Sequence, residues 1–125
     1  MRQSTFLRER YDRFKAFHKA NPQVYVLFVR FAEMARTKGR RPRFGARMIG
    51  ERIRWYTAVE TTSTDDYKIN DHFWPYYARL LMLTRPEFDG FFERRDARFD
   101  IDDATLLMEC GGWPPEPRQE TLFDA

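Results

Sequence analysis

The sequence predicts a mainly α-helical fold, a small domain of four to five helices followed by a flexible C-terminal tail. Three observations support this class. Apolar side chains recur at helical spacing through most of the first 111 residues, and residues suited to helix ends stand between the periodic segments. The pattern ends after Gly112, where WPPEPRQETLFDA is acidic and rich in proline. We therefore divide the chain into a helical domain, residues 1–111, and a tail, residues 112–125.

The first two predicted elements are amphipathic helices that meet at Asn21. In STFLRERYDRFKAFHKA, Ser4 is the expected N-cap, and large apolar residues follow at helical spacing. Asn21 and Pro22 suit the N-cap and first turn of the second helix, because proline lacks only an N–H that a first turn does not use. Gly39 suits its end. We expect these two helices to pack as an antiparallel pair.

A basic connector, RRPRFG, separates the second helix from the third. Pro42 excludes a helix interior here, and Gly45 loosens the chain before the next periodic segment. That segment, ARMIGERIRWYTAVE, predicts a helix over residues 46–60. Its expected inward side chains are Met48, Ile49, Ile53, Tyr56 and Val59.

The second half predicts shorter helices after the polar loop TTSTDD. Asn70 or Asp71 caps a fourth helix whose body is residues 76–83, and PEFDGFFERR reads as a short fifth helix. The YKI segment, between the polar loop and the fourth helix, is expected to be a short strand or an extended link. Asp102 or Asp103 caps a last turn or two that ends at Cys110 before two glycines.

The charge of +3 hides a strong asymmetry along the chain. Residues 36–54 hold eight basic residues and one acid, whereas residues 100–125 hold seven acids and one base. Such a separation is typical of a body that binds a polyanion and carries an acidic tail. Each Lys or Arg placed near a phosphate releases condensed counterions, so this cluster predicts sequence-independent affinity for DNA.

A helix-turn-helix or winged-helix arrangement over residues 36–79 suits this charge pattern. The helix beginning near Asn70 is the expected base-reading element, and the alternative is stacking of Trp74 or Tyr77 on an unpaired base. The opposing interpretation is a solvated arginine face that pairs with the acidic tail. The candidate DNA-binding residues are Arg36, Lys38, Arg40, Arg41, Arg43, Arg47, Arg52, Arg54, Lys68, Asn70, His72, Tyr76 and Arg79.

A family resemblance adds a biological setting. The strings FHKANPQVY, IRW, YKIN, YYAR and FFERR resemble a group of small, uncharacterised proteins encoded in bacteriophage and prophage genomes. The similarity covers residues 14–95, about two-thirds of the chain. It implies a phage or prophage origin and the cytoplasm of a bacterial host cell, and it implies no particular chemistry. The tail lies outside it.

The C-terminal peptide QETLF resembles the pentapeptide by which bacterial replication and repair proteins hold the sliding clamp, the DNA polymerase III beta subunit. Gln119, Leu122 and Phe123 match the main positions of that pattern, and Glu120 departs from its usual leucine. The resemblance implies that two adjacent apolar side chains enter a shallow pocket while the glutamine amide fixes the register. The prolines before the peptide keep it extended, which limits the ordering cost of binding.

Enzymatic motifs are missing from the sequence. Neither a phosphate-binding glycine loop nor a G-x-S-x-G turn is present, and a Cys110–His72 nucleophile and base would need a proximity that no spacing indicates. One cysteine and two histidines are too few for a typical zinc site. We expect a non-enzymatic protein with no cofactor, no metal and no membrane span.

Two other function classes remain open from the sequence. One is a helical protein-interaction module, such as an inhibitor of a host defence protein, whose basic face covers an enzyme's nucleic-acid groove. The other is a helix-turn-helix transcriptional repressor, which would require a dimer and a specific site. A clamp-binding peptide likewise serves a recruiter or an inhibitor equally well.

Overall fold

The computed structural model describes residues 2–60, 69–93 and 101–111, with side chains from residue 8 onward. These ranges contain five α-helices: α1 (Arg2–Ala20), α2 (Pro22–Lys38), α3 (Ala46–Trp55), α4 (Trp74–Thr84) and α5 (Asp103–Cys110). Three short turns accompany them: the π-helical η1 (Tyr56–Glu60) and the 3-10 helices η2 (Asp71–Phe73) and η3 (Pro86–Phe88). The mainly α class is confirmed. The predicted tail and the TTSTDDYK loop lie outside the described residues.

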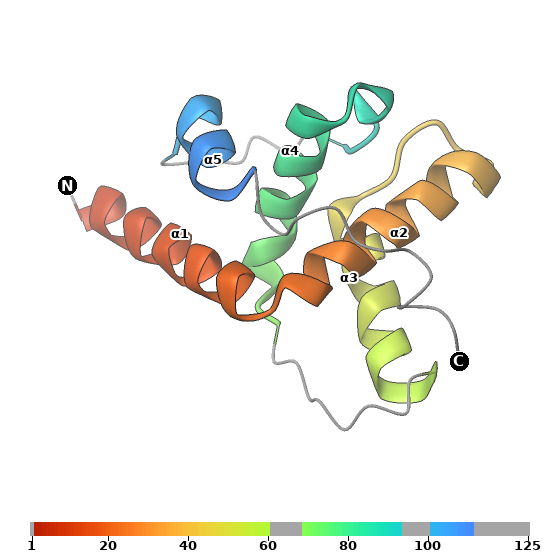
Figure 1. Ribbon diagram of the computed structural model, residues 1–125, viewed down its shortest axis with the longest axis horizontal. Helices are drawn as coiled ribbons and strands as arrows, with labels where there is room; N and C mark the ends of the chain where they lie inside the picture. Colours follow the sequence, from red (N-terminus) through yellow and green to blue (C-terminus); the bar gives the residue numbers. More distant parts are fainter. Residues whose placement is uncertain (1, 61–68, 94–100, 112–125) are drawn as a thin grey trace.

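Helix α4 occupies the centre of the fold. It packs against α2, α3 and α5, and six of its side chains are buried (Figure 1). Helices α1 and α2 diverge from their junction at Asn21 instead of lying side by side (Figure 1), so the antiparallel pair we expected is wrong. The space between them is filled by α4, whose large aromatic side chains contact both.

The ends of the first two helices differ in detail from expectation. Helix α1 begins at Arg2, so Ser4 lies within it and is not its N-cap. The Asn21 amide does not cap α2; its Nδ2 donates to the Phe17 carbonyl at 3.2 Å and closes the end of α1. Pro22 opens α2 and Gly39 ends it, as expected. A Cβ on Gly39 would lie 2.3 Å from the Ala35 carbonyl oxygen, so only glycine fits this close approach.

The caps expected in the second half are confirmed. The Asn70 side chain accepts a hydrogen bond from the His72 N–H at 2.9 Å, and Asp102 accepts from the Thr105 N–H at 2.7 Å. The helix expected over PEFDGFFERR is wrong. Of its described residues, 86–93, only those of η3 are helical, and the chain then turns at Gly90, whose φ of 71° favours glycine.

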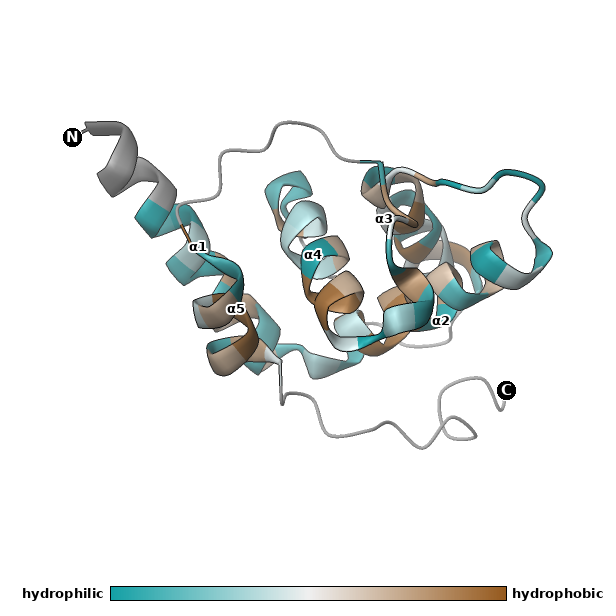
Figure 2. Cartoon of the chain, turned by 90° about the horizontal axis from the view of Figure 1, so that it is seen from above, coloured by the Kyte–Doolittle hydropathy of each residue, from teal (hydrophilic) through white to brown (hydrophobic). Residues whose placement is uncertain are grey.

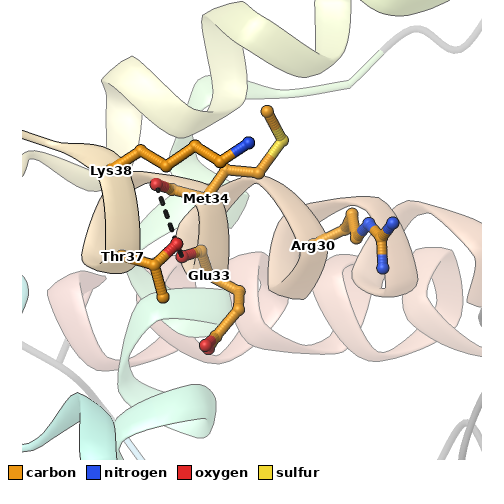
Figure 3. A pocket seen from close by; sticks show the side chains of 5 residues that line it. All are labelled: Arg30, Glu33, Met34, Thr37 and Lys38. Carbon is orange, nitrogen blue, oxygen red and sulfur yellow. Dashed lines mark hydrogen bonds between the residues drawn. The ribbon is translucent and has the colours of Figure 1, made fainter.

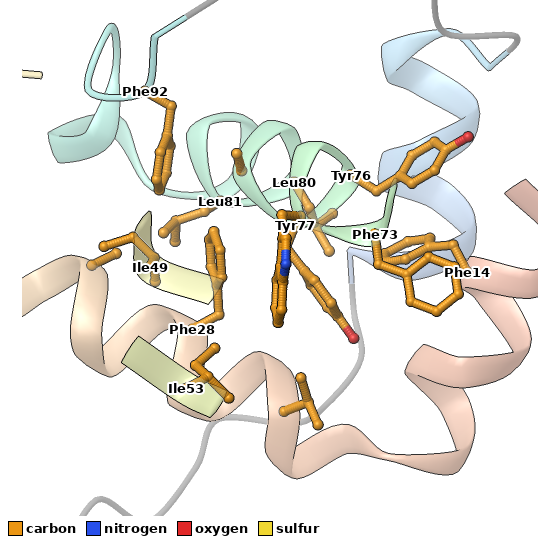
Figure 4. Close-up of a cluster of buried hydrophobic side chains, with 14 of the residues drawn as sticks. Phe14, Phe28, Ile49, Ile53, Phe73, Tyr76, Tyr77, Leu80, Leu81 and Phe92 are labelled. Atoms are coloured by element: carbon orange, nitrogen blue, oxygen red, sulfur yellow. The ribbon is translucent and has the colours of Figure 1, made fainter. Parts of the chain in front are cut away.

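Aromatic side chains make up half of the buried core residues (Figure 4). Phe14 from α1 stacks on Tyr76 at 4.7 Å between ring centroids and meets Tyr77 edge-on at 4.9 Å. Phe28 from α2 stacks on Tyr77 at 5.6 Å. Each such pair contributes about 0.5–1.5 kcal/mol beyond the burial of its area. These contacts make α4 a scaffold that holds α1 and α2 in place.

The close approach of α3 to α4 depends on Gly50. A Cβ at this position would lie 2.2 Å from the Trp74 ring, so the indole packs directly on the α3 backbone. Ile49 and Ile53 are buried on the same side, as predicted. Met48 and Val59 were expected to face inward and do not, because the buried side of α3 is already defined by Gly50 and the two isoleucines.

Across the part of the chain that the structure describes, no helix combines the length and apolar character needed to cross a bilayer.

Candidate nucleic-acid interface

Most described arginines of the helices form ion pairs with carboxylates of their own or of neighbouring elements. Five of the candidate DNA-binding residues form such ion pairs, so part of the predicted positive field is neutralised within the fold. The pairs are Arg36 with Glu33, Arg47 with Glu51 and Asp71, Arg52 with Glu60, Arg54 with Glu51 and Asp71, and Arg79 with Asp103. Exposed pairs of this kind contribute at most about 1 kcal/mol each, but they lower the net charge offered to a polyanion.

Arg54 has a structural role at the start of α4. Its guanidinium donates to the Ile69 carbonyl at 2.8 Å and to Asp71, which also accepts from the Trp74 indole N–H at 3.3 Å. Partial burial raises the pKa of the Asp71 carboxyl, but the hydrogen bond and charge of Arg54 outweigh it, so that pKa is lowered overall. The arrangement fastens α3 to η2 and α4 and uses Arg54 for the fold.

The segment between α2 and α3 differs from the helices in its electrostatics. We call residues 38–43, which are the last residue of α2 and the five that follow it, the cationic connector, and each of its four basic side chains is exposed. No described carboxylate forms an ion pair with any of them: Lys38, Arg40, Arg41 and Arg43. Figure 2 shows the connector as a hydrophilic loop that stands out from the helices. It is therefore the most concentrated unneutralised positive charge in the described part of the chain.

Both ends of the cationic connector are fixed to the core. At one end Gly39 donates to the Ala35 carbonyl at 2.9 Å. At the other, Phe44 is buried, stacks on Phe91 at 5.5 Å, and exchanges two backbone hydrogen bonds of 3.0 Å with the 91–93 segment. The connector is thus a short loop whose two ends are held by the core. Because its backbone is already restrained, it loses less conformational entropy on binding.

Arg41 is a connector residue that contacts α3 directly. Its guanidinium lies 4.9 Å from the centre of the Phe44 ring, and its Nη2 approaches the Met48 sulfur at 3.4 Å. Met48 is half-exposed, so Arg41 links the connector to the outer face of α3.

The residues expected to read bases are not brought together on a free helix face. Tyr76 is only 2% exposed and packs on Phe14, which leaves its ring no surface for a base, and Arg79 is held by Asp103. Asn70 and His72 are exposed, but the Asn70 side chain is engaged in capping. Because α4 is enclosed by three helices, it is not available for a groove, and a helix-turn-helix is not confirmed. Lys68 lies outside the described residues.

The aromatic residues proposed for base stacking are also in the core. Trp74 and Tyr77 are buried against Gly50 and Phe28, so neither faces solvent. Among the described residues, the exposed indole is that of Trp55 at the end of α3, with 58% of its surface accessible. Sequence reasoning missed it. Its exposure could have been predicted from its spacing of seven residues from Met48. This spacing places both side chains on one side of α3, opposite Ile49 and Ile53.

The hollow on the outer side of α2 does not resemble an enclosed active site. It measures about 330 Å³, and all its lining side chains come from this one helix (Figure 3): Arg30, Glu33, Met34, Thr37 and Lys38. The Thr37 hydroxyl donates to the Glu33 carbonyl at 2.9 Å, within the helix. Lys38 nevertheless connects this hollow to the cationic connector.

The two groups considered as a nucleophile and base, Cys110 and His72, differ in their exposure. Cys110 is buried in α5 beside the Tyr11 hydroxyl, 3.9 Å away, and burial raises the pKa of its thiol. His72 is exposed in η2, the turn that precedes α4. Among the described residues, no group of three or more His, Cys, Asp or Glu side chains is placed to hold a metal ion. The clamp-binding candidates Gln119, Leu122 and Phe123 lie outside the described residues.

Comparison with known proteins gives no match: no family model, no curated protein and no solved structure is similar to this chain.

Proposed function

We propose that this chain is a non-enzymatic protein of phage or prophage origin that binds DNA through its cationic connector and docks on the bacterial sliding clamp through its C-terminal peptide. The observation that supports the DNA contact is the connector itself. Its four exposed cations have no carboxylate partner among the described residues, while the helical arginines nearby do. Phosphate oxygens would supply the missing counter-charge.

The anchoring of the connector strengthens this proposal. Because Gly39 and Phe44 fix its ends, the cations are held close together before any partner arrives. A preorganised cluster loses less entropy on binding than side chains on a free tail would. The contact is expected to be independent of base sequence, since it is made to phosphates.

A charge-matched pair of variants tests the DNA contact. The connector variant carries Lys38→Gln, Arg40→Gln and Arg43→Gln, and it leaves Arg41 on Phe44. The control carries Arg8→Gln, Arg13→Gln and Lys19→Gln, which are exposed residues of α1 outside the connector. Both lose three positive charges.

The connector variant is expected to bind a DNA duplex about 10- to 100-fold more weakly than the unmodified chain near physiological salt, and the control only slightly more weakly. Fluorescence anisotropy with a labelled oligonucleotide measures both. Equal losses in the two variants would assign the binding to overall charge and contradict a connector site. Absence of binding by the unmodified chain to duplex and single-stranded DNA alike would reject the DNA contact.

The clamp contact is supported by the sequence of the tail. QETLF supplies the glutamine and the two adjacent apolar residues of the clamp-binding pattern, and three prolines precede it. Burying Leu122 and Phe123 in a pocket would contribute about 1.5–3 kcal/mol each. A single peptide of this kind gives an affinity in the micromolar range, about 8 kcal/mol.

Calorimetry with purified beta clamp tests this contact. The full chain is expected to bind, and Leu122→Ala with Phe123→Ala to reduce the affinity by more than about 100-fold. Glu120→Ala is the control, since it removes a tail residue outside the three anchoring positions. Undiminished binding by the double variant, or no binding by the full chain, would exclude the peptide as a clamp ligand.

The two contacts reinforce each other on a clamp that encircles DNA. Docking the tail holds the connector near the duplex and raises its effective concentration there. A recruiter and an inhibitor of the clamp both use this arrangement. The inhibitor version predicts slower growth of the bacterial host on expression, relieved by the same double substitution at Leu122 and Phe123.

A further inference from the structure

We infer that the cationic connector binds single-stranded DNA in preference to a duplex and that Trp55 stacks on one of the unpaired bases. This inference rests on the proposed function, because it assigns a substrate class to the same surface. It starts from a line of exposed apolar side chains on the outer face of α3 and η1. This apolar stripe consists of Met48, Trp55 and Val59, with exposed fractions of 48%, 58% and 60%.

The stripe is a single feature because of its spacing. Its members stand seven and four residues apart, which places them on one side of a helix. The opposite side, with Gly50 and Ile53, is buried against Trp74 and the core. The indole therefore projects from a rigid support, since the α3 backbone beneath it is packed tightly on α4.

The stripe is continuous with the cationic connector. Arg41, one of the four connector cations, places its Nη2 3.4 Å from the sulfur of Met48, the first member of the stripe. Trp55 follows Met48 by seven residues, about 10 Å along the helix axis. A strand whose phosphates contact the connector can therefore lay a nearby base on the indole.

The charges beside Trp55 permit an anionic strand to approach. One turn before it, the Glu51 carboxylate is engaged by Arg54 at 3.1 Å and by Arg47 at 3.8 Å. On the other flank Arg52 pairs with Glu60 at 3.0 Å, and its guanidinium lies 4.4 Å from the Phe31 ring centre. The described carboxylates next to the stripe are thus balanced by arginines.

The combination favours a single strand over two other partners. A duplex offers phosphates to the connector but covers the faces of its bases, so the indole would gain no stacking partner. A second copy of this chain would cover the apolar stripe but would bring more positive charge to the connector. An unpaired strand supplies both phosphates and open base faces, the pairing of basic groove and aromatic platform by which single strands are bound.

Binding of the full-length chain to a labelled 20-nucleotide oligothymidine and to a duplex of the same length tests this inference. Trp55→Ala is expected to weaken oligothymidine binding by about 5- to 100-fold and to leave duplex binding nearly unchanged. Trp55→Phe retains a stacking ring and is expected to recover most of the affinity. Met108→Ala, which trims an apolar side chain of α5 that is 79% exposed, is the control.

Each remaining outcome has a separate meaning. The stacking inference is overturned if the connector variant loses affinity for DNA and Trp55→Ala does not. It is also overturned if Trp55→Ala weakens the binding of oligothymidine and of the duplex equally. In both cases the proposed function stands. If the unmodified chain binds neither nucleic acid, the proposed function fails and the inference with it. Sedimentation gives a further outcome. If Trp55→Ala converts a dimer to a monomer without a selective loss of oligothymidine binding, a second copy of the chain covers the stripe and the inference is wrong.

Discussion

Tyr11 shows how one residue joins distant parts of this fold. Its ring is fully buried between α1 and α4, and its hydroxyl donates to the Glu109 carboxylate in α5 at 2.6 Å. The same carboxylate accepts from Lys15 at 3.4 Å. The hydrogen bond from Tyr11 is the main reason that the pKa of Glu109 is lowered, and Lys15 adds to the effect. Burial raises the pKa of the Tyr11 hydroxyl, so this group stays a donor.

This contact predicts a pH-dependent contribution to stability. Because the pKa of Glu109 is lower in the folded chain than its ordinary value of 4.5, its ionised form stabilises the fold above that value. The contribution is lost as the pH falls below 4.5 and through the folded pKa. Glu109→Gln should therefore be less stable than the unmodified chain at pH 7, and the difference should shrink on acidification.

Chemical denaturation at a series of pH values measures the free energy of unfolding of both proteins. Glu9→Gln, which changes an exposed carboxylate of α1, is the matched control and should follow the unmodified chain. A difference between Glu109→Gln and the unmodified chain that stays constant with pH would show that the carboxylate contributes packing and not charge.

At the residue scale, the large apolar residues of the core were predictable from the sequence, but which tryptophan is exposed was not. Trp55 and Trp74 are both tryptophans in helical segments. Trp74 is the buried one because its ring packs on Gly50 of another helix. Such a contact joins positions 24 residues apart, and periodicity within one helix carries no information about it. The placement of Met48 and Val59 was an avoidable error, since Gly50 and Ile53 already marked the buried side.

At the scale of elements, helix α3 depends on its close approach to α4. Gly50→Ala raises intrinsic helix propensity by about 1 kcal/mol, yet its Cβ would stand 2.2 Å from the Trp74 ring. Relieving that overlap requires α3 or the buried indole to shift, and overpacking of this kind costs about 1–3 kcal/mol. We predict a net loss of stability and a lower thermal midpoint.

Gly45→Ala is the matched control for this prediction. Gly45 has a φ of −79°, which any residue adopts, and the nearest atom to an added Cβ is a Glu93 carboxylate oxygen at 3.9 Å. Thermal unfolding followed by circular dichroism should show a clearly smaller change for Gly45→Ala. A Gly50→Ala protein as stable as the unmodified chain would mean that α3 and α4 tolerate a wider separation.

Element boundaries were most predictable where a local signal sets them. Asn70, Asp102 and Gly39 act within their own turns, so the sequence narrowed each cap to two adjacent residues and identified Gly39 as the end of α2. The angle between α1 and α2 was not predictable in this way, because it is set by the aromatic side chains of α4. The segment after Pro86 was misread as a helix because Phe44 recruits its backbone into a bridge with Phe92.

For the whole molecule, charge along the sequence predicted a basic surface but not its distribution. The excess of arginine in residues 36–54 was visible at once, whereas its division into paired and unpaired groups depends on folding. Arg54, for example, meets Asp71 only because η2 lies against α3. The connector keeps its charge because it projects from the helices between two anchors, a property of the fold and not of its composition.

The dependence of DNA affinity on salt concentration tests the central claim, that the cationic connector binds a polyanion, most directly. Four connector cations in contact with phosphates predict that the logarithm of the association constant falls with the logarithm of salt with a slope of about −3. The variant with glutamine at positions 38, 40 and 43 should show a slope nearer −1. A slope near zero for the unmodified chain, between low and moderate salt, would contradict the account.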